Sequence, residues 1–291
     1  GVRRALELTQ KSAALSPTCT LGELIHNRQV VEELAGQGVT VIERPEDAPA
    51  GAAVVIRSHG VGPQVYDTLR AQGSPVIDAT CPFVKRIHQI AAEVPENGLL
   101  LLAGRREHPE VQGILGYCRG PALVFSSAEE MQELLAFLPS DGNIPVILAA
   151  QTTFSLREWE KILFFAKKVC TNLKVFDTIC RATIERQSEA KQLAQSADAM
   201  VVVGGLHSAN TTALAALCGS YCPTVQVETA DQLERHREAL RGARFIGITA
   251  GASTPACIIK EVQNSMSVLE NNTEEMNFGE LLDQYSKSIH N

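Results

Sequence analysis

The stretch PVIDATCP, residues 75–82, places a cysteine where a strand is expected to give way to a helix. Apolar and β-branched residues at 76 and 77 are typical of a buried strand, and a proline is favourable in the first turn of a helix. The sequence therefore predicts that Cys81 lies at a strand-to-helix corner. Ligands of open parallel sheets bind beyond the carboxyl ends of the strands, so this position raises the question of a functional thiol.

The same arrangement recurs along the chain. Short apolar runs alternate with helical patterns, which predicts parallel sheets joined by crossover helices. Two expected strands, at 39–45 and 122–127, end in ordinary loop residues. Eight other runs end in clusters of polar or small residues: 20–27, 52–60, 75–82, 98–110, 144–153, 173–180, 199–210 and 244–254. We expect these eight endings to line a shared site.

A weak internal repeat supports a modular chain. Cys81 and Cys180 lie 99 positions apart, and each follows a strand that carries an aspartate and precedes a helix. The repeat indicates modules of about 90 residues. Counting back by one module from Cys81 leads to residues 1–15, which already have a helical pattern. We therefore expect the sequence to begin part-way through a module.

Composition sets broad limits on function. The chain has 291 residues, 45% of them hydrophobic, which is enough for two or three domains with their own cores. A formal net charge of −7 argues against a broad nucleic-acid surface, although a small anion can still bind at helix N-termini. No apolar run approaches the roughly 18 residues of a membrane span, and residues 1–10 do not have a signal-peptide pattern. A cytoplasmic protein is expected.

The eight cysteines are expected to be free, metal-bound or catalytic rather than disulfide-bonded. Five of them have apolar or helical surroundings that favour simple packing: Cys19, Cys118, Cys170, Cys218 and Cys257. The spacing of Cys218 and Cys222 is only a weak zinc signal, because no second ligand pair accompanies it. His88 and His236 lie on charged helical stretches, where we expect solvated faces.

Taken together, the strand endings resemble a known family. The blocks are HN at 26–27, SHG at 58–60, DATCP at 78–82, HPEV at 108–111, QTT at 151–153, IC-x-AT-x-x-RQ at 179–187, SAN at 208–210 and TAGAST at 249–254. Their order and approximate spacing are similar to those of the LytB family of 4-hydroxy-3-methylbut-2-enyl diphosphate reductases. The resemblance covers about 260 residues.

The resemblance implies an α/β fold of three pseudo-repeated αβα modules, with mostly parallel sheets around a central cavity. It assigns residues 1–81, 82–178 and 179–268 to modules one to three, and 269–291 to a polar tail or linker. The family holds an oxygen-sensitive 4Fe-4S cluster with three cysteines, which leaves one iron open to the substrate hydroxyl. Cys81 and Cys180 resemble two of these metal ligands.

The resemblance also assigns roles around the cluster. The substrate-binding residues that it implies are His26, His59, His108, Thr152, Ser208, Asn210 and Ser253, which would hold the diphosphate by charge-assisted hydrogen bonds. Glu110 resembles the proton donor, and Thr152 would relay or position that proton. Taken alone, HPE is an ordinary proline-led helix start with an acidic first turn.

The implied reaction belongs to the non-mevalonate (MEP) route to isoprenoids. Two electrons and two protons enter, water leaves, and isopentenyl and dimethylallyl diphosphate form. The resemblance implies a small carrier such as ferredoxin or flavodoxin as the electron donor. No G-x-G-x-x-G fingerprint for a nicotinamide or flavin follows any expected strand.

Two departures from the family pattern leave alternatives open. The first cluster cysteine would fall two positions before Gly1, and Ala209 stands where relatives commonly have serine. Residues 270–291 resemble a linker that, in some relatives, leads to RNA-binding OB-fold repeats. The alternatives are an inactive fragment or diphosphate-binding module without a complete cluster, and a zinc hydrolase that uses strand-end histidines and cysteines.

Overall fold

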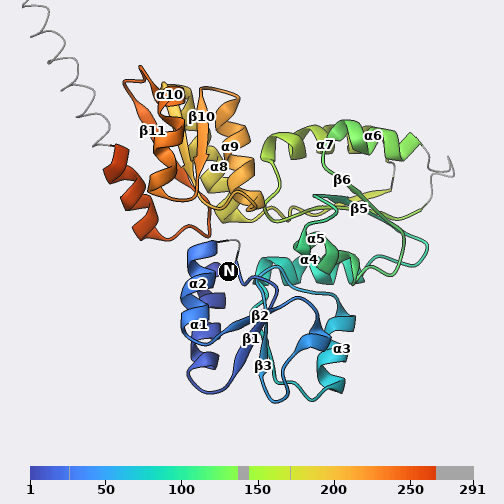
Figure 1. Cartoon of the computed structure of the whole chain (residues 1–291). Coiled ribbons are helices and arrows are strands. Elements are labelled where there is room, and N and C mark those ends of the chain that lie inside the picture. Colours follow the sequence, from blue (N-terminus) through green and yellow to red (C-terminus); the bar gives the residue numbers. More distant parts are fainter. Residues whose placement is uncertain (26, 137–143, 171, 267–291) are drawn as a thin grey trace, which may run out of the picture. The chain divides into compact units, whose positions relative to one another are not determined.

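The structure is a computed structural model that describes residues 1–25, 27–136, 144–170 and 172–266. Three parallel sheets follow one another along the chain, each flanked by helices (Figure 1). This confirms the predicted α/β class and its mostly parallel sheets. Within the described residues, no helix is both long and apolar enough to cross a lipid bilayer.

The first sheet has the order β2-β1-β3-β4. Its strands are β1 (Thr18–Leu21), β2 (Thr40–Ile42), β3 (Ala53–Ile56) and β4 (Val76–Asp78), and all neighbours run parallel. The central strands β1 and β3 are buried at every residue. The accompanying helices are α1 (Val2–Ala13), α2 (Arg28–Gly36), α3 (Pro63–Ala71) and the short 3-10 helix η1 (Pro45–Asp47).

The second sheet repeats this topology in the order β6-β5-β7-β8. Its strands are β5 (Leu99–Ala103), β6 (Ala122–Phe125), β7 (Val146–Ala150) and β8 (Leu173–Val175). Its helices are α4 (Pro82–Ala92), α5 (Pro109–Leu115), α6 (Ala128–Ala136) and α7 (Leu156–Val169). The side chains of β5 alternate between two cores: Leu99 and Leu101 pack with Trp159, and Leu100 and Leu102 pack with Ile87. Burial on both faces explains why these strands read as unbroken apolar runs.

The third sheet has the order β10-β9-β11. Its strands are β9 (Ala199–Val203), β10 (Thr224–Val227) and β11 (Ile246–Ala250), and they are also parallel. The helices of this region are α8 (Arg181–Ser196), α9 (Ala209–Gly219), α10 (Arg237–Leu240), the 3-10 helix η2 (Ala230–His236) and a helical stretch at 256–266. As far as the described residues go, this sheet has no counterpart of β4 and β8.

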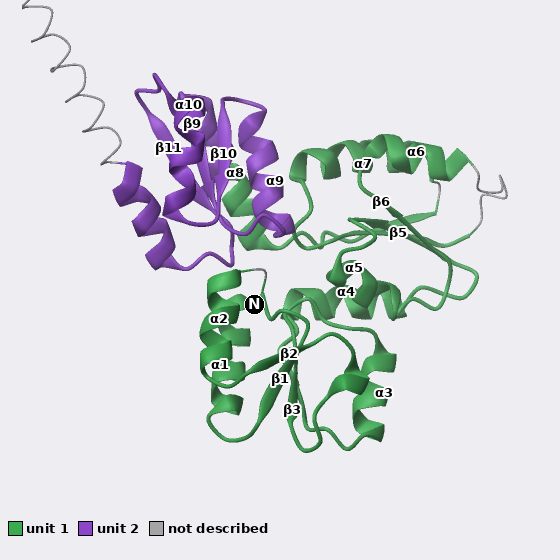
Figure 2. Cartoon of the chain, viewed as in Figure 1, with its two compact units in different colours: residues 1–188 green, residues 189–291 purple. Residues whose placement is uncertain are grey.

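The chain divides into two compact units, residues 1–188 and 189–291 (Figure 2). The first unit contains the first two sheets, and the second contains the third sheet. The division falls inside α8. The module boundaries predicted at 81, 178 and 268 therefore stay predictions, and the predicted tail at 269–291 lies outside the described residues.

Most predicted strands are present, with two differences. The run at 20–27 is strand only to Leu21, because the chain turns at Gly22 with φ +71°. Strand β10 was not predicted, since Gln226 interrupts its apolar pattern and it lies at the edge of its sheet, where burial is alternate. The predicted corner is confirmed: β4 ends at Asp78, and Cys81 is the N-cap of α4, which starts at Pro82.

Thr178 extends the pairing between β7 and the chain that follows β8. Its buried hydroxyl donates to the Ala150 carbonyl at 2.6 Å and accepts from the Ala150 N–H at 2.8 Å. Thr178→Val keeps the shape but leaves both backbone groups without these bonds, so we expect the free energy of unfolding to fall by about 2 kcal/mol. Thr178→Ser keeps the hydroxyl and should lose about 1 kcal/mol or less. Urea unfolding of both variants checks this, and a valine variant as stable as wild type would contradict it.

Candidate active site

Cys81 is tied to the turn that carries His59. The turn at Ser58, His59 and Gly60 follows β3, and the corner at Cys81 follows the neighbouring strand β4. The Cys81 N–H donates to the Ser58 carbonyl at 3.0 Å. Two adjacent parallel strands thus deliver a thiol and an imidazole to one edge of the first sheet.

The His59 ring contacts the ring of His108. Their centroids lie 5.3 Å apart with the planes at 88°, which is an edge-to-face contact. His108 is the N-cap of α5, and its Nδ1 accepts from the Glu110 N–H at 3.1 Å. Because a nitrogen that accepts a hydrogen bond carries no proton, Nε2 is the protonated nitrogen of this ring and can donate to a ligand.

Glu110 is a buried carboxyl group bound to one threonine. It is 2% exposed, and its Oε1 accepts from the Thr152 N–H at 2.6 Å. Its Oε2 accepts from the Thr152 hydroxyl at 2.7 Å. Burial raises the pKa of Glu110 to about 7, although both hydrogen bonds from Thr152 oppose the shift. A carboxyl group with such a pKa can hold and release a proton near neutral pH.

Thr152 also connects this carboxyl group to the second predicted cluster cysteine. The Cys180 N–H donates to the Thr152 carbonyl at 2.9 Å, just before α8 begins at Arg181. Gln187 fixes α8 to the same loop, since its amide donates to the Phe154 carbonyl and accepts from the Leu156 N–H. A continuous path of contacts therefore joins Cys81, His59, His108, Glu110, Thr152 and Cys180.

The second unit holds its own group of polar residues at strand ends. Ser208 and Asn210 follow β9, and Ser253 follows its parallel neighbour β11. Ser208 caps the eleven-residue helix α9 by accepting from the Thr211 N–H. Asn210 is 7% exposed, and in the described residues its Nδ2 has no hydrogen-bond partner. Such a buried donor at a helix start is suited to an anionic ligand.

Two cysteines fit part of the ligand set that the resemblance implies. Cys81 and Cys180 are free and half-buried. Among the residues that the structure describes, no three His, Cys, Asp or Glu side chains gather closely enough to hold a metal ion. Gly1 lies beside Cys81, because a Cβ atom on Gly1 would lie 3.0 Å from the Cys81 Sγ. The two thiols suit an iron–sulfur cluster in their chemistry, and one thiolate of the expected three is still needed.

Other predicted residues have mixed outcomes. His26 lies outside the described residues, whereas its neighbour Asn27 caps α2 by accepting from the Val30 N–H. Cys19 and Cys218 are buried in the core, as predicted. The prediction for Cys257 was wrong, because this thiol is exposed at the start of the helical stretch at 256–266.

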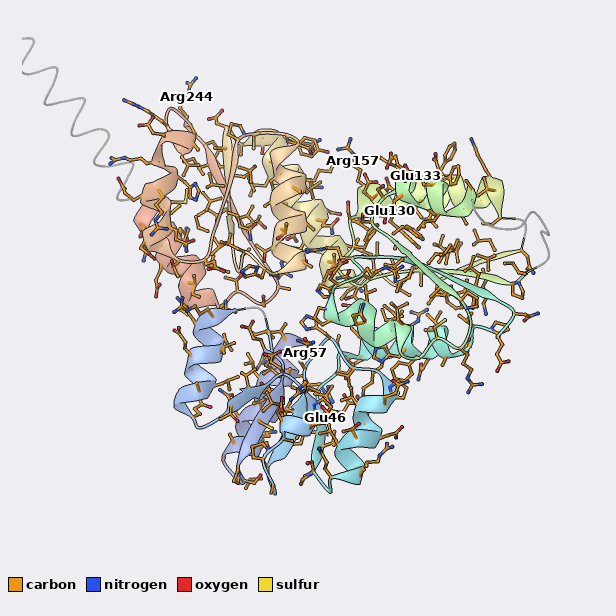
Figure 3. The ribbon with its side chains drawn as sticks, turned by 45° about the vertical axis from the view of Figure 1, so that its right-hand side comes forward. Glu46, Arg57, Glu130, Glu133, Arg157 and Arg244 are labelled. Atoms are coloured by element: carbon orange, nitrogen blue, oxygen red, sulfur yellow. The ribbon has the colours of Figure 1, made fainter. Side chains whose placement is uncertain are left out.

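The prediction for His88 was also wrong, because it is 5% exposed rather than solvated. Its helix, α4, buries the face that carries Val84, Ile87 and Ala91, and the charged neighbours of His88 conceal this pattern. Sequence reasoning also missed Arg57, the residue before the His59 turn (Figure 3). Its guanidinium fills the space beside Gly22, and burial lowers its pKa while Glu43 and Glu23 oppose the shift.

Comparisons with known proteins agree on one family. Residues 1–267 match the family model described as LytB protein. A 4-hydroxy-3-methylbut-2-enyl diphosphate reductase of Caldanaerobacter subterraneus subsp. tengcongensis is 39% identical over 284 residues, which cover 94% of this chain and 95% of the relative. The reductase of the same name from Oleidesulfovibrio alaskensis is 43% identical over 253 residues, covering 86% and 88%.

Solved structures show the same likeness. The structure of the E-1-hydroxy-2-methyl-but-2-enyl-4-diphosphate reductase from Plasmodium falciparum matches with a TM-score of 0.84 at 26% identity, covering 90% of this chain and 83% of that one. A structure of (E)-4-hydroxy-3-methyl-but-2-enyl diphosphate reductase, titled the terminal enzyme of the non-mevalonate pathway, matches with a TM-score of 0.63 at 37% identity. It covers 91% of this chain and 94% of that chain.

The raised pKa of Glu110 predicts a pH-dependent stability difference. The Glu110 carboxyl group of the folded protein keeps its proton up to about pH 7, whereas the unfolded chain releases it near the ordinary glutamate pKa of 4.5. Wild type therefore loses stability as pH rises between these two values, and Glu110→Gln lacks this loss. We expect the glutamine variant to gain about 2–3 kcal/mol relative to wild type between pH 4.5 and 8.

Urea unfolding at a series of pH values measures this difference. Glu133→Gln, on the exposed face of α6 (Figure 3), is the matched control. Its free energy of unfolding should change with pH in the same way as that of wild type. If the free energies of unfolding of Glu110→Gln and wild type differed by the same amount at every pH, the pKa of Glu110 would not be raised by folding, and the prediction would be wrong.

Proposed function

The chain belongs to the LytB family, and on this basis we propose that it reduces (E)-4-hydroxy-3-methylbut-2-enyl diphosphate to isopentenyl and dimethylallyl diphosphate, the last step of the non-mevalonate pathway. The observation that carries the proposal is the path of contacts from Cys81 through His59, His108, Glu110 and Thr152 to Cys180. It brings thiols, imidazole donors and a protonated carboxyl group into one connected set.

Cys81 and Cys180 are the proposed protein ligands of a 4Fe-4S cluster. When bound, such a cluster supplies electrons and a Lewis-acidic iron for the substrate hydroxyl. The family pattern puts the third thiolate two positions ahead of Gly1. The position of Gly1 beside Cys81 supports this, because a cysteine two residues ahead of Gly1 would be close enough in the chain to lie near the Cys81 thiol.

Glu110 is the proposed proton donor. Breaking the carbon–oxygen bond releases the hydroxyl oxygen as water only if a proton reaches that oxygen, and two electrons and a second proton complete the balance. At pH 7 a carboxyl group with a pKa of about 7 is partly protonated, which suits this role. The Thr152 hydroxyl, bound to Oε2, fixes the carboxyl orientation and can pass a proton to it.

Imidazole and hydroxyl donors are proposed to bind the diphosphate, as the resemblance implies. His59 and His108 are two of these donors, and Thr152, a third, is joined to His108 through Glu110. Ser208, Asn210 and Ser253, together with the N-terminus of α9, keep the diphosphate-binding role that the resemblance implies for them. His26 keeps its predicted role as a further donor. The missing hydroxyl at Ala209 should weaken binding by about 1 kcal/mol.

The electron donor is proposed to be a small ferredoxin- or flavodoxin-type carrier. Binding of the diphosphate without reduction, the alternative left open by the sequence, would follow if the cluster lacked its third ligand. The predicted link to RNA-binding OB-fold repeats stays a prediction, since residues 267–291 lie outside the described part of the chain.

Iron content tests the proposed ligands. Anaerobic protein that includes a cysteine two positions ahead of Gly1 is expected to bind about four iron and four sulfide per chain. Cys81→Ala and Cys180→Ala should each lower the iron content well below that value, because each removes one of three protein ligands. Cys257→Ala removes an exposed thiol outside the site and should leave it unchanged. Full iron content in either of the first two variants would exclude that cysteine as a ligand.

Steady-state kinetics test the proton donor. Glu110→Gln keeps the shape but cannot release a proton, so kcat should fall by about 10²- to 10⁴-fold with iron content retained. Thr152→Val should also lower kcat, whereas Thr152→Ser, which keeps the hydroxyl, should stay near wild type. Glu133→Gln serves again as the surface control. Near-normal turnover by Glu110→Gln would assign proton donation to another group.

A further inference from the structure

His88 occupies a buried place on α4 that its charged neighbours do not suggest. Its ring stacks on Tyr117, with centroids 4.4 Å apart and the planes at 19°. Its Nε2 is buried and has no hydrogen-bond partner among the described residues. A buried polar atom without a partner is unfavourable by about 1–3 kcal/mol, so its presence here calls for an explanation.

The edge of the His88 ring lies directly against the turn that carries His59. A Cβ atom placed on Gly60 would lie 2.5 Å from the His88 Cε1 and 3.1 Å from its Nε2. Gly60 also has φ +71°, a conformation that glycine adopts without strain. The residue after His59 is therefore held against His88 with no room for a side chain between them.

The same ring edge also contacts α5, the helix that begins with His108 and Glu110. A Cβ atom on Gly113 would lie 3.4 Å from the His88 Nε2 and 3.4 Å from the Gly60 carbonyl carbon and oxygen. One turn further along, a Cβ atom on Gly116 would lie 2.8 Å from the Gly62 Cα. The turn and α5 thus pack backbone against backbone, and His88 lies where the two meet.

His88 therefore touches three parts of the candidate site. Its own helix is capped by Cys81, the turn at Gly60 follows His59, and α5 is capped by His108 and contains Glu110. The contact between the His59 and His108 rings, 5.3 Å between centroids, depends on how the turn is placed on α5. The Thr80 methyl group also lies against the turn, because a Cβ atom on Gly60 would lie 2.9 Å from its Cγ2.

We propose that His88 is a positioning residue that fixes the His59 turn on α5, and so sets the spacing of His59 and His108 for the diphosphate. It does not contact the substrate, and the proposal rests on the proposed function. The contacts are made by the Cε1 and Nε2 atoms of His88, which fill the space between Gly60 and Gly113.

The charge state of His88 agrees with a packing role. Burial lowers the pKa of His88 to about 4, with Asp78 raising it and Lys85 lowering it further. The ring is therefore neutral at pH 7, and Asp78 pairs with Lys85 at 2.6 Å instead. A neutral ring packs against the backbone of Gly60 and Gly113 without a buried charge.

The test compares two substitutions of His88 with a matched control on the same helix, in the cluster-loaded enzyme. His88→Asn keeps the first atoms of the side chain but lacks Cε1 and Nε2, and His88→Ala removes the ring entirely. Ile90→Ala, which also empties a buried site on α4, is the control, because Ile90 packs in the apolar core with Leu100 and Leu102, and none of its atoms is among the three nearest to a Cβ atom on Gly60 or Gly113. The measurements are KM for the allylic diphosphate, the melting temperature, and hydrogen exchange of the amides at 57–62.

For both His88 variants we expect KM to rise about tenfold or more, since small misplacements of binding groups have large effects, and exchange at 57–62 to become faster. Ile90→Ala should lower the melting temperature with KM unchanged. Unchanged exchange, or faster exchange with unchanged KM, in a folded His88 variant would overturn the proposal. If wild type did not turn over the diphosphate at all, the proposed function would fail, whereas the exchange result would still decide whether His88 holds the turn.

Discussion

The Glu110 carboxyl group, kept out of water between the N–H and the hydroxyl of Thr152, is the interaction on which the rest of the site depends. It joins α5 to the loop after β7, although the two residues are 42 positions apart in sequence. Thr152 in turn accepts a hydrogen bond from the Cys180 N–H. The backbone N–H of Glu110 donates to His108 and so orients that ring. The proposed proton donor thereby also fixes the geometry of its neighbours.

This arrangement follows from the parallel sheets. Strands β3, β4, β5, β7 and β8 belong to two sheets with the same topology, and each chain segment that leaves them at the carboxyl end carries one component of the site. Buried central strands such as β5 hold these ends in place with packing on both faces. The edge strands β2 and β6 carry no such residues, which matches their ordinary loop endings.

The sequence predicted the fold class and the Cys81 corner because apolar runs and Pro82 report directly on local structure. It did not predict β10, whose burial alternates at a sheet edge, or the buried position of His88, which depends on glycines distant in sequence. The pairing of Glu110 with Thr152 could not be derived from spacing either, because HPE alone reads as a common helix start. Its role came from the resemblance, and its raised pKa comes from burial that only the tertiary structure shows. His26 is still a prediction.

The proposed function requires Cys81 and Cys180 to hold one cluster beside the Glu110–Thr152 pair. A crystal structure of the anaerobically purified protein with the allylic diphosphate bound tests it most directly. We expect a single 4Fe-4S cluster bonded to both sulfur atoms, with the substrate hydroxyl oriented toward Glu110 and Thr152 and the phosphates bound by the histidines. A cluster bonded to other residues, or a diphosphate bound away from His59 and His108, would contradict it.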